Sequence, residues 1–428
     1  MEMTKYKLGE LAEVTRGASL SGQFYAEKGK LIRLTLGNFN MNGGGFKENT
    51  SKTDLYFTGT VRDEFILNEG DIITPLTEQS LGLLGTTARI PESGKYIQSQ
   101  DVALVRCKKG LLDPNFCYYL ISSSIVRQQL SAAAQQTKIR HTSPEKIKDC
   151  TVWIPDFDVQ KNIGRILTDI DNKIVINRRI NDNLEAMAKQ LYDYWFVQFD
   201  FPNEEGKPYK SSGGAMVWNE KLKREIPQGW NAANIFDELS VQYGFPFSTD
   251  LFTEKPTNIP VVRIRDILEN SVSAYSREEA DEKYKLQKQD LLIGMDGNFH
   301  MNYWNDNVSY LNQRSVRLRA KPNSTVSILQ ARYDIAPYIK AKELRAKGST
   351  VGHLSDKDLK ELFVLVSPNA DFRNKFDSIL AEIIENRCEI ESLTKQRDEL
   401  LPLLMNGQAS VNYHLSVLFL SSLILYRH

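Results

Sequence analysis

The sequence predicts a mixed α/β (α+β) protein built from two related halves, each a globular domain followed by a long amphipathic helix. The observation behind this prediction is that residues 158–197 and 371–407 both carry apolar residues every three or four positions. The stripe of the first stretch consists of Ile166, Ile170, Ile180, Leu184, Met187 and Leu191. The stripe of the second stretch consists of Ile379, Ile383, Ile390, Leu393, Leu400 and Leu404. Five pairs across the two stripes share one separation of 213 positions, which indicates an internal duplication.

The two helices are expected to pack against each other within the chain. A helix over residues 160–197 would be about 55 Å long, and apolar steps of four and three are typical of coiled coils. Polar residues interrupt the two stripes, and such residues weaken a helix seam but fix its register. These residues are Lys173, Asn177, Asn386 and Arg397. An ordinary core helix is the alternative interpretation of each stretch.

Length and composition describe an ordinary globular protein. The chain has 428 residues, enough for two or three domains, and is 41% apolar and 25% charged. Lys plus Arg equals Asp plus Glu at 54 each, so the net charge is zero. Any contact with nucleic acid must therefore come from local patches.

Cysteine and histidine usage predicts no metal site and no disulfide framework. The four cysteines show no CxxC spacing, and the five histidines are scattered. The polar N-terminus has no features of a signal peptide, so we expect a cytoplasmic protein.

Six segments are expected along the chain. They are a first domain (1–155), the first helix (156–200), a linker rich in Gly, Pro and Ser (201–229), a second domain (230–366), the second helix (367–410) and a hydrophobic tail (411–428).

The first domain is expected to be rich in strands, which are followed by one helix over residues 115–130. The second domain repeats this plan with more drift. Val316 and Leu318 echo Val102 and Leu104 at a separation of 214, and His353 echoes His141 at 212. Shifting separations place the insertions and deletions in loops.

Enzyme motifs are present only as near misses. Asp113-Pro114-Asn115-Phe116 resembles the tetrad of amino-methyltransferases but lacks its second proline, and the start of a helix explains it more simply. Residues 22–30 lack the glycine spacing and the Ser or Thr of a phosphate-binding loop. We therefore expect a protein that is not itself an enzyme.

A resemblance to a known family follows from the centre of the chain. Residues 191–202 (LYDYWFVQFDFP), 206–210 (GKPYK) and 225–230 (EIPQGW) resemble the central conserved region of Type I restriction-modification specificity subunits. The turn at Gly70-Asp71 and the helix start at Gln160 also match this family. The second copy departs from the pattern, because Arg373 stands where Gln160 would recur.

The resemblance implies a non-catalytic subunit with two target-recognition domains, each reading one half of a bipartite DNA site. The long helices would pack antiparallel as a pseudo-twofold coiled-coil spacer and would dock two methyltransferase subunits, which flip an adenine in each half-site. A restriction or motor subunit would join the complex. S-adenosylmethionine, ATP and magnesium would belong to these partners, leaving this chain with no cofactor and no membrane contact. Two alternatives remain open: a stand-alone DNA-binding or anti-restriction module, and a modification enzyme in its own right.

Candidate DNA-reading residues are planar or forked donors near strand ends and loops, with cations nearby for phosphates. In the first domain they are Arg16, Ser19, Asn38, Asn40, Gln79, Lys138, Arg140 and His141. In the second domain they are Tyr243, Arg263, Asn298, His300, Gln313, Arg314 and Lys347. The alternative for each is a solvated surface residue, and the Asn-containing groups could equally form turns.

The tail of the chain departs from the family pattern. From Leu415 to Tyr426, twelve residues are all apolar except three serines. This run is too short to span a bilayer, which needs about 20 residues. We expect an appended segment outside the functional core that packs loosely on the rest of the protein, because an exposed patch of this size promotes aggregation.

Overall fold

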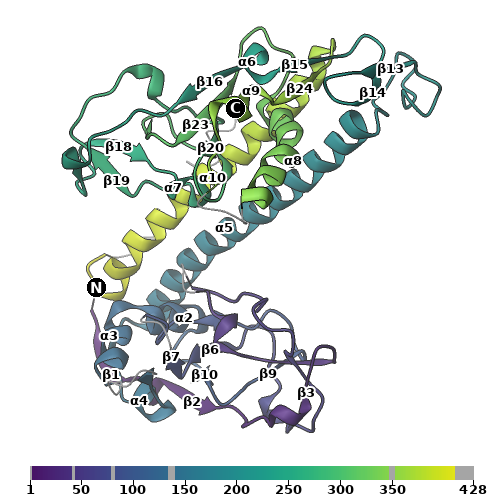
Figure 1. Cartoon of the computed structure of the whole chain (residues 1–428). Helices are drawn as coiled ribbons and strands as arrows, with labels where there is room; N and C mark the ends of the chain where they lie inside the picture. The colour runs from purple at the N-terminus through teal and green to yellow at the C-terminus, as the bar shows by residue number, and fades with distance from the viewer. Residues whose placement is uncertain (1, 41–43, 79–81, 134–139, 347–351, 410–428) are drawn as a thin grey trace. The chain divides into compact units, whose positions relative to one another are not determined.

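The computed structural model describes residues 2–40, 44–78, 82–133, 140–346 and 352–409 (Figure 1). The chain divides into two compact units: unit 1 comprises residues 1–174 and 392–428, and unit 2 comprises residues 175–391. The two long helices, α5 (Phe157–Tyr192) and α10 (Ala370–Met405), each contribute one part to each unit. The sequence predicted each long helix as a separate segment, whereas each helix is divided between the two units.

Unit 1 is organised around an antiparallel sheet in the order β2-β10-β6-β8. Its strands are β2 (Ala12–Arg16), β10 (Val102–Cys107), β6 (Ile72–Pro75) and β8 (Ala88–Arg89). Strand β10 is buried on both faces, because Ala103 and Val105 join one hydrophobic core while Val102 and Leu104 join another. A run of apolar residues without alternation is the sequence pattern of such a central strand.

A second four-stranded sheet and two strand pairs complete the β-structure of unit 1. The sheet has the order β3 (Tyr25–Ala26), β5 (Tyr56–Phe57), β4 (Leu31–Arg33) and β9 (Tyr96–Ile97). The pairs are β1 (Thr4–Lys7) with β12 (Thr151–Ile154), and β7 (Thr77–Glu78) with β11 (Arg140–His141).

The shorter helices of unit 1 are α1 (Leu8–Leu11), α2 (Pro114–Ser122), α3 (Ser124–Ala133) and α4 (Pro144–Lys148). Asp113 caps α2 by accepting a hydrogen bond from the backbone N–H of Phe116 at 3.0 Å, so the near-miss methyltransferase tetrad is a helix start. The single helix expected over residues 115–130 is interrupted at Ser123, whose side chain and backbone N–H both donate to Leu120 O.

Unit 2 repeats the same strand orders, which confirms the duplication. Its sheets are β16-β23-β20-β21 and β17-β19-β18-β22, with β15 pairing β24 as β1 pairs β12. The first sheet consists of β16 (Leu239–Tyr243), β23 (Ser315–Ala320), β20 (Leu291–Gly294) and β21 (Met301–Tyr303). The second sheet and the β15–β24 pair consist of β15 (Asn231–Asn234), β17 (Phe252–Thr253), β18 (Ile259–Val262), β19 (Ala274–Ser276), β22 (Tyr310–Leu311) and β24 (Phe363–Val366).

Unit 2 also contains the helices α6 (Ile235–Glu238), α7 (Asp266–Glu269), α8 (Ile328–Ala346) and α9 (Asp356–Lys360). Helix α8 packs along β24 (Figure 1). It also contributes Leu329, Ile335 and Ile339 to the large core that the sheet shares with α10.

Strand register corrects one part of the sequence comparison. Arg16 pairs with Ala103 in unit 1, and Tyr243 pairs with Val316 in unit 2. Val316 is thus the counterpart of Ala103, so the matches of Val316 with Val102 and of Leu318 with Leu104 are wrong by one residue. The physical reason is a loop: the connection before β23 is one residue shorter than the connection before β10.

In unit 1 the two long helices pack antiparallel. Ile163 and Leu167 of α5 share a core with Leu404 and Met405 of α10. Further along α5, Asp171 forms an ion pair with Arg397 at 3.0 Å. Arg397 therefore lies on the seam, as the polar interruption of its stripe predicted.

In unit 2 the same two helices are held by amide side chains. Asn177 donates to Glu389 at 2.6 Å, and Asn386 donates to the side-chain oxygen of Asn181 at 3.0 Å. Asn181 in turn donates to the carbonyl of Ile383. Buried polar partners of this kind fix one helix register, so the role expected of Asn177 and Asn386 is supported.

Burial agrees with the predicted stripe on α10 and disagrees with part of the predicted stripe on α5. Four α10 positions are buried and the other two, Ile390 and Leu400, are half-buried. On α5, Ile166, Ile170, Leu184 and Leu191 are only half-buried. Ile180 is 38% and Met187 47% exposed, which contradicts their assignment to the seam.

The error arises because the buried face of α5 lies on a different side of the helix from the predicted stripe. Its buried face is formed by Ile163, Leu167, Ile174, Asn177, Asn181, Ala188 and Tyr192. Successive helix residues are about 100° apart, which places this face about 60–100° from the predicted stripe. Because two asparagines occupy the true seam, a search for apolar residues selects the neighbouring face instead.

The segment expected as a linker carries ordered structure of unit 2. It contains a hairpin of β13 (Met216–Asn219) and β14 (Arg224–Pro227). Phe201, at its start, and Trp230, the residue after its end, stack on each other with ring centroids 4.9 Å apart. Both rings also contact Phe372 of α10, so the ends of this segment are anchored in the core of unit 2.

The hydrophobic tail, 411–428, lies outside the described residues. Within the described part of the chain, no helix is long and apolar enough to cross a membrane.

Candidate nucleic-acid interface

Four segments meet at one end of the central sheet of unit 1. The end of β2 is held by the pairing of Arg16 with Ala103. The backbone N–H of Leu76 donates to Asp101 O, and that of Thr142 donates to Leu76 O, both at 2.8 Å. Strands β7 and β11 pair with each other at this end of the sheet. The side chains placed along it belong to Arg16, Thr77, Asp101 and His141, which we call polar edge 1.

Unit 2 builds the same edge with the same backbone contacts. Met295 N–H donates to Arg314 O at 2.9 Å, and Leu354 N–H donates to Met295 O at 2.7 Å. A bridge between Asp296 and His353 takes the place of the pair Thr77–His141. The residues of polar edge 2 are Tyr243, Asp296, Arg314 and His353, each the counterpart of one residue in polar edge 1.

Side chains of polar edge 2 are linked through one carboxylate. Asp296 Oδ2 lies 3.0 Å from Arg314 Nη1, and Asp296 Oδ1 lies 2.6 Å from His353 Nδ1. Tyr243 Oη donates to Asp356 at 2.5 Å. Loss of hydration, together with the Asp356 carboxylate, raises the pKa of Tyr243 above its ordinary value, so the phenol stays protonated.

Further predicted residues lie on the loops beside polar edge 2. The exposed Asn298 and the half-buried His300 form a short turn, in which His300 N–H donates to Asn298 O and His300 O accepts from Gly294 N–H. The exposed Gln313 immediately precedes Arg314. The structure thus gathers Tyr243 and Arg314, with these loop residues beside them, at one end of one sheet.

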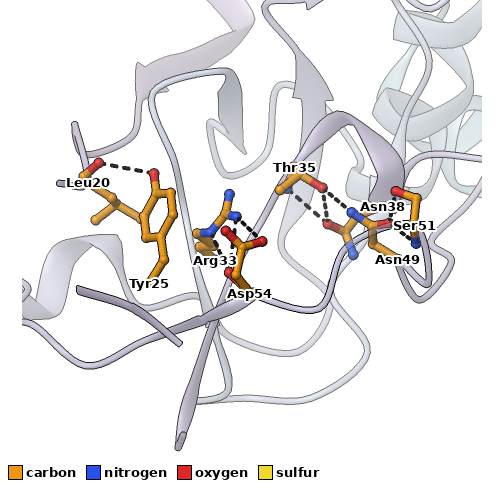
Figure 2. A network of polar contacts seen from close by, with 8 residues as sticks. All are labelled: Leu20, Tyr25, Arg33, Thr35, Asn38, Asn49, Ser51 and Asp54. Atoms are coloured by element: carbon orange, nitrogen blue, oxygen red, sulfur yellow. Dashed lines mark hydrogen bonds and ion pairs between the residues drawn. The ribbon is translucent and has the colours of Figure 1, made fainter. Parts of the chain in front are cut away.

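Some predicted readers are instead engaged in holding the fold. Asn38 is buried and caps its own turn, accepting from the backbone N–H and the hydroxyl of Thr35 (Figure 2). Arg140 pairs with the buried carboxylate of Glu78 at 3.0 Å and also donates to Ser131. Arg263 donates to the carbonyl of Ser273 at 2.9 Å. For Asn38 the assignment as a reader is wrong, because burial removes its amide from any ligand.

The remaining predicted residues differ in exposure. Arg16, Ser19 and His141 are exposed, and Asn40 is half-buried. Three others lie outside the described residues: Gln79, Lys138 and Lys347.

Sequence reasoning missed Thr77, Asp101, Asp296 and His353 as members of the two edges. One signal was available, because His141 and His353 had already been matched as repeat counterparts. The others could not be recognised, since their counterparts differ in chemistry and only the strand register aligns them. Among the described residues, no group of His, Cys, Asp and Glu is arranged to hold a metal ion.

A duplicated domain with equivalent polar sheet edges defines a class of protein with two related domains in one chain. The sequence model of the family described as Type I restriction modification DNA specificity domain matches residues 1–186 and 227–399. Because the match covers most of the chain, this protein belongs to that family and is a Type I restriction-modification specificity subunit.

Two relatives agree with this assignment, and one solved structure shares the fold. The chain is 25% identical over 317 residues to the Type I restriction enzyme MjaIX specificity subunit of Methanocaldococcus jannaschii, covering 71% of both chains. It is 26% identical over 172 residues to the EcoBI specificity subunit of Escherichia coli, covering 39% of this chain and 36% of that one. The crystal structure of the Type I restriction-modification S subunit from M. genitalium has the same fold, with a TM-score of 0.60, 16% identity and coverage of 95% and 96% of the two chains.

Proposed function

We propose that this specificity subunit selects a bipartite DNA target, with polar edge 1 contributing to recognition of one half-site and polar edge 2 to recognition of the other. The observation that carries this proposal is that the two edges occupy the same strand positions but present different side chains. Arg16 is replaced by Tyr243, and Asp101 by Arg314. A shared framework with different donors and acceptors suits the reading of two different base sequences in the major groove.

The exposed members of each edge would contact base edges, while cations on neighbouring loops would contact phosphates and position the domain. Because the chain as a whole has no net charge, affinity for DNA would depend on these local patches and would fall as salt increases. The chain itself would supply recognition only. S-adenosylmethionine, ATP and magnesium would be bound by partner subunits, and the methyl group would be transferred to an adenine flipped out of each half-site.

An exposed apolar stripe on α5 supports docking of a partner subunit. Within unit 2, Ile176 is 53% exposed, and Ile180 and Met187 continue the same side of the helix. A contiguous apolar stripe of this kind supports an interaction surface, because covering it would remove apolar area from water. We propose that a methyltransferase subunit covers this stripe, with a second methyltransferase subunit and the restriction subunits completing the complex.

Exchange of one domain tests the proposal. Residues 1–155 would be replaced by the corresponding domain of another specificity subunit, and methylated adenines would be mapped in cells that also express the methyltransferase subunit. The expected result is a motif in which one half changes and the other is retained. A change in both halves would contradict independent reading, and an exchange that leaves both halves unchanged would show that this domain does not read DNA.

Gel filtration of the co-expressed subunits separates this proposal from a stand-alone DNA-binding module. Co-elution of this chain with the methyltransferase is expected. Separate elution of two folded proteins would favour the stand-alone module.

A further inference from the structure

The Arg314 guanidinium is hydrogen-bonded through one nitrogen, and most of the Arg314 side chain is exposed to solvent. Its Nη1 donates to Asp296 Oδ2 at 3.0 Å, which is its one hydrogen bond among the described residues. The side chain is nevertheless 71% exposed. A carboxylate that binds one nitrogen of a guanidinium restricts the orientation of the plane and leaves other N–H groups available for a ligand.

The backbone of Arg314 is in a conformation that favours glycine. Its φ is +65°, in the left-handed region where an L-residue with a Cβ is disfavoured. Arg314 ends the connection before β23, which has one residue fewer than its counterpart in unit 1. Glycine would satisfy the same turn without strain. Most of the Arg314 side chain lies in solvent, so it gains little packing that would offset this strain, and such strained positions cluster at functional sites.

We propose that Arg314 reads a guanine in the half-site recognised by unit 2, and that Asp296 is the positioning residue that orients its guanidinium. This inference rests on the proposed function. Guanine presents two acceptors, O6 and N7, in the major groove, and a forked pair of guanidinium N–H groups matches them. His353 Nδ1 lies against the other oxygen of Asp296, so both carboxylate oxygens are engaged and the side chain is fixed.

The equivalent positions of unit 1 lack this arrangement. Asp101 occupies the place of Arg314, and Thr77 occupies the place of Asp296. An acidic side chain cannot donate to O6 and N7 of guanine when it is ionised. The guanine contact from this position is therefore specific to the half-site of unit 2.

The variant Arg314→Gly tests the inference without endangering the fold. Glycine removes the backbone strain, so the melting temperature of the chain is expected to equal or exceed that of the wild type. Motifs would be determined for the complex with its methyltransferase subunit, on DNA in which every base of the unit 2 half-site is varied. Loss of the forked contact is expected to reduce the preference for guanine at one position by about 5- to 160-fold, with the other half-site unchanged.

Two further variants complete the experiment: one is a matched control, and the other tests the positioning residue. Arg277→Ala removes the same charge from an exposed residue that follows β19 in the other sheet, and it should leave the base preference at every position intact. Asp296→Ala should lower discrimination at the same position as Arg314→Gly. At the same time it should raise non-specific affinity, because a negative charge near the DNA is lost. A purely structural role of Asp296 would not produce both effects together.

Each outcome decides the question. An unchanged motif in Arg314→Gly overturns the inference, and so does a uniform loss of affinity for all sequences, which would show a phosphate contact instead. A wild-type complex that methylates at no defined motif would overturn the proposed function itself. A wild-type motif that is defined, but has no guanine whose preference depends on Arg314, would overturn only this inference.

Discussion

Asn386 donates a hydrogen bond to the side-chain oxygen of Asn181 at 3.0 Å, joining α10 to α5 within unit 2. Both amides are buried, and Asn181 also donates to the carbonyl of Ile383. The two helices thus meet through a polar contact where an apolar one would be more stable. Buried amide pairs disfavour shifted alignments of two helices, because any shift leaves the amides without partners.

Removing one amide of this pair should destabilise unit 2. For Asn386→Ala we expect a loss of about 1–3 kcal/mol, because Asn181 keeps a buried oxygen that has lost its donor. Replacing both residues by leucine should restore most of this stability, at the cost of register specificity. Urea unfolding followed by circular dichroism measures the effect, with Asn183→Ala on the exposed side of α5 as the control. A double leucine variant less stable than Asn386→Ala would contradict the assignment.

Leu393 and Ile180 are repeat counterparts that should respond differently to the same substitution. Leu393 is 2% exposed, so Leu393→Asp buries an unpaired charge and is expected to cost several kcal/mol. Ile180→Asp should cost less than about 1 kcal/mol, because the position is accessible to water. Thermal melting of the two single variants checks this expectation.

Ile180→Asp should also prevent co-purification of the methyltransferase subunit, although the chain remains folded. Unfolding caused by Ile180→Asp would show that the residue belongs to the helix seam. Retention of the partner would show that the exposed stripe of α5 is not the docking surface.

Because of Asp334, we expect the free energy of unfolding to fall as the pH rises from about 4 to about 6. Its carboxylate accepts hydrogen bonds from Tyr192 Oη at 2.8 Å and from the N–H of Leu365 at 3.1 Å. Loss of hydration nevertheless raises its pKa from 3.8 to about 6. The folded state therefore holds its proton more tightly than the unfolded state. The stabilisation is complete below pH 4 and is lost as the pH rises through 6, a change of roughly 2–3 kcal/mol.

The neutral analogue Asp334→Asn should remove this dependence. We expect it to raise the melting temperature at pH 8 and to have little effect at pH 4, because the amide carries no charge to desolvate. Asp182→Asn, at an exposed position on α5, is the control and should not alter the pH profile. A variant that destabilises the chain equally at both pH values would show that hydrogen-bond geometry, rather than charge, decides the energy at this site.

Arg140 and His141 are adjacent residues with separable roles. Glu78 is 2% exposed, and its Oε2 accepts from the backbone N–H groups of Leu83 and Leu84, both at 3.0 Å. Arg140→Ala would leave this carboxylate without its cation, which is expected to cost about 3 kcal/mol or more. His141→Ala should change stability by less than about 0.5 kcal/mol and should weaken binding to DNA. Paired melting and DNA-binding measurements distinguish the two, and equal destabilisation by both variants would contradict this division.

Much of the architecture could be predicted because it depends on local pattern. Helical periodicity does not need a tertiary partner to be visible, so the extents of α5 and α10 and their duplication followed from spacing alone. The cap at Asp113 was likewise predictable, because capping depends on residues three positions apart. The structural role of Asn38 could not be predicted from the sequence. Its side chain matches that of a base-reading residue, and only the fold shows that Thr35 and Lys47 occupy its donors and acceptors.

The sequence by itself determined that this protein is duplicated, that each copy ends in a long amphipathic helix, and that it belongs with specificity subunits. Repeated spacing and a distinctive central run are properties of the chain order. Only the tertiary structure decided which face of α5 forms the seam, because the seam is selected by hydrogen bonds of Asn177 and Asn181 rather than by hydrophobicity. It alone placed Asp296 against Arg314, since residues 18 positions apart in a loop-rich segment are brought together by strand register and not by any local rule.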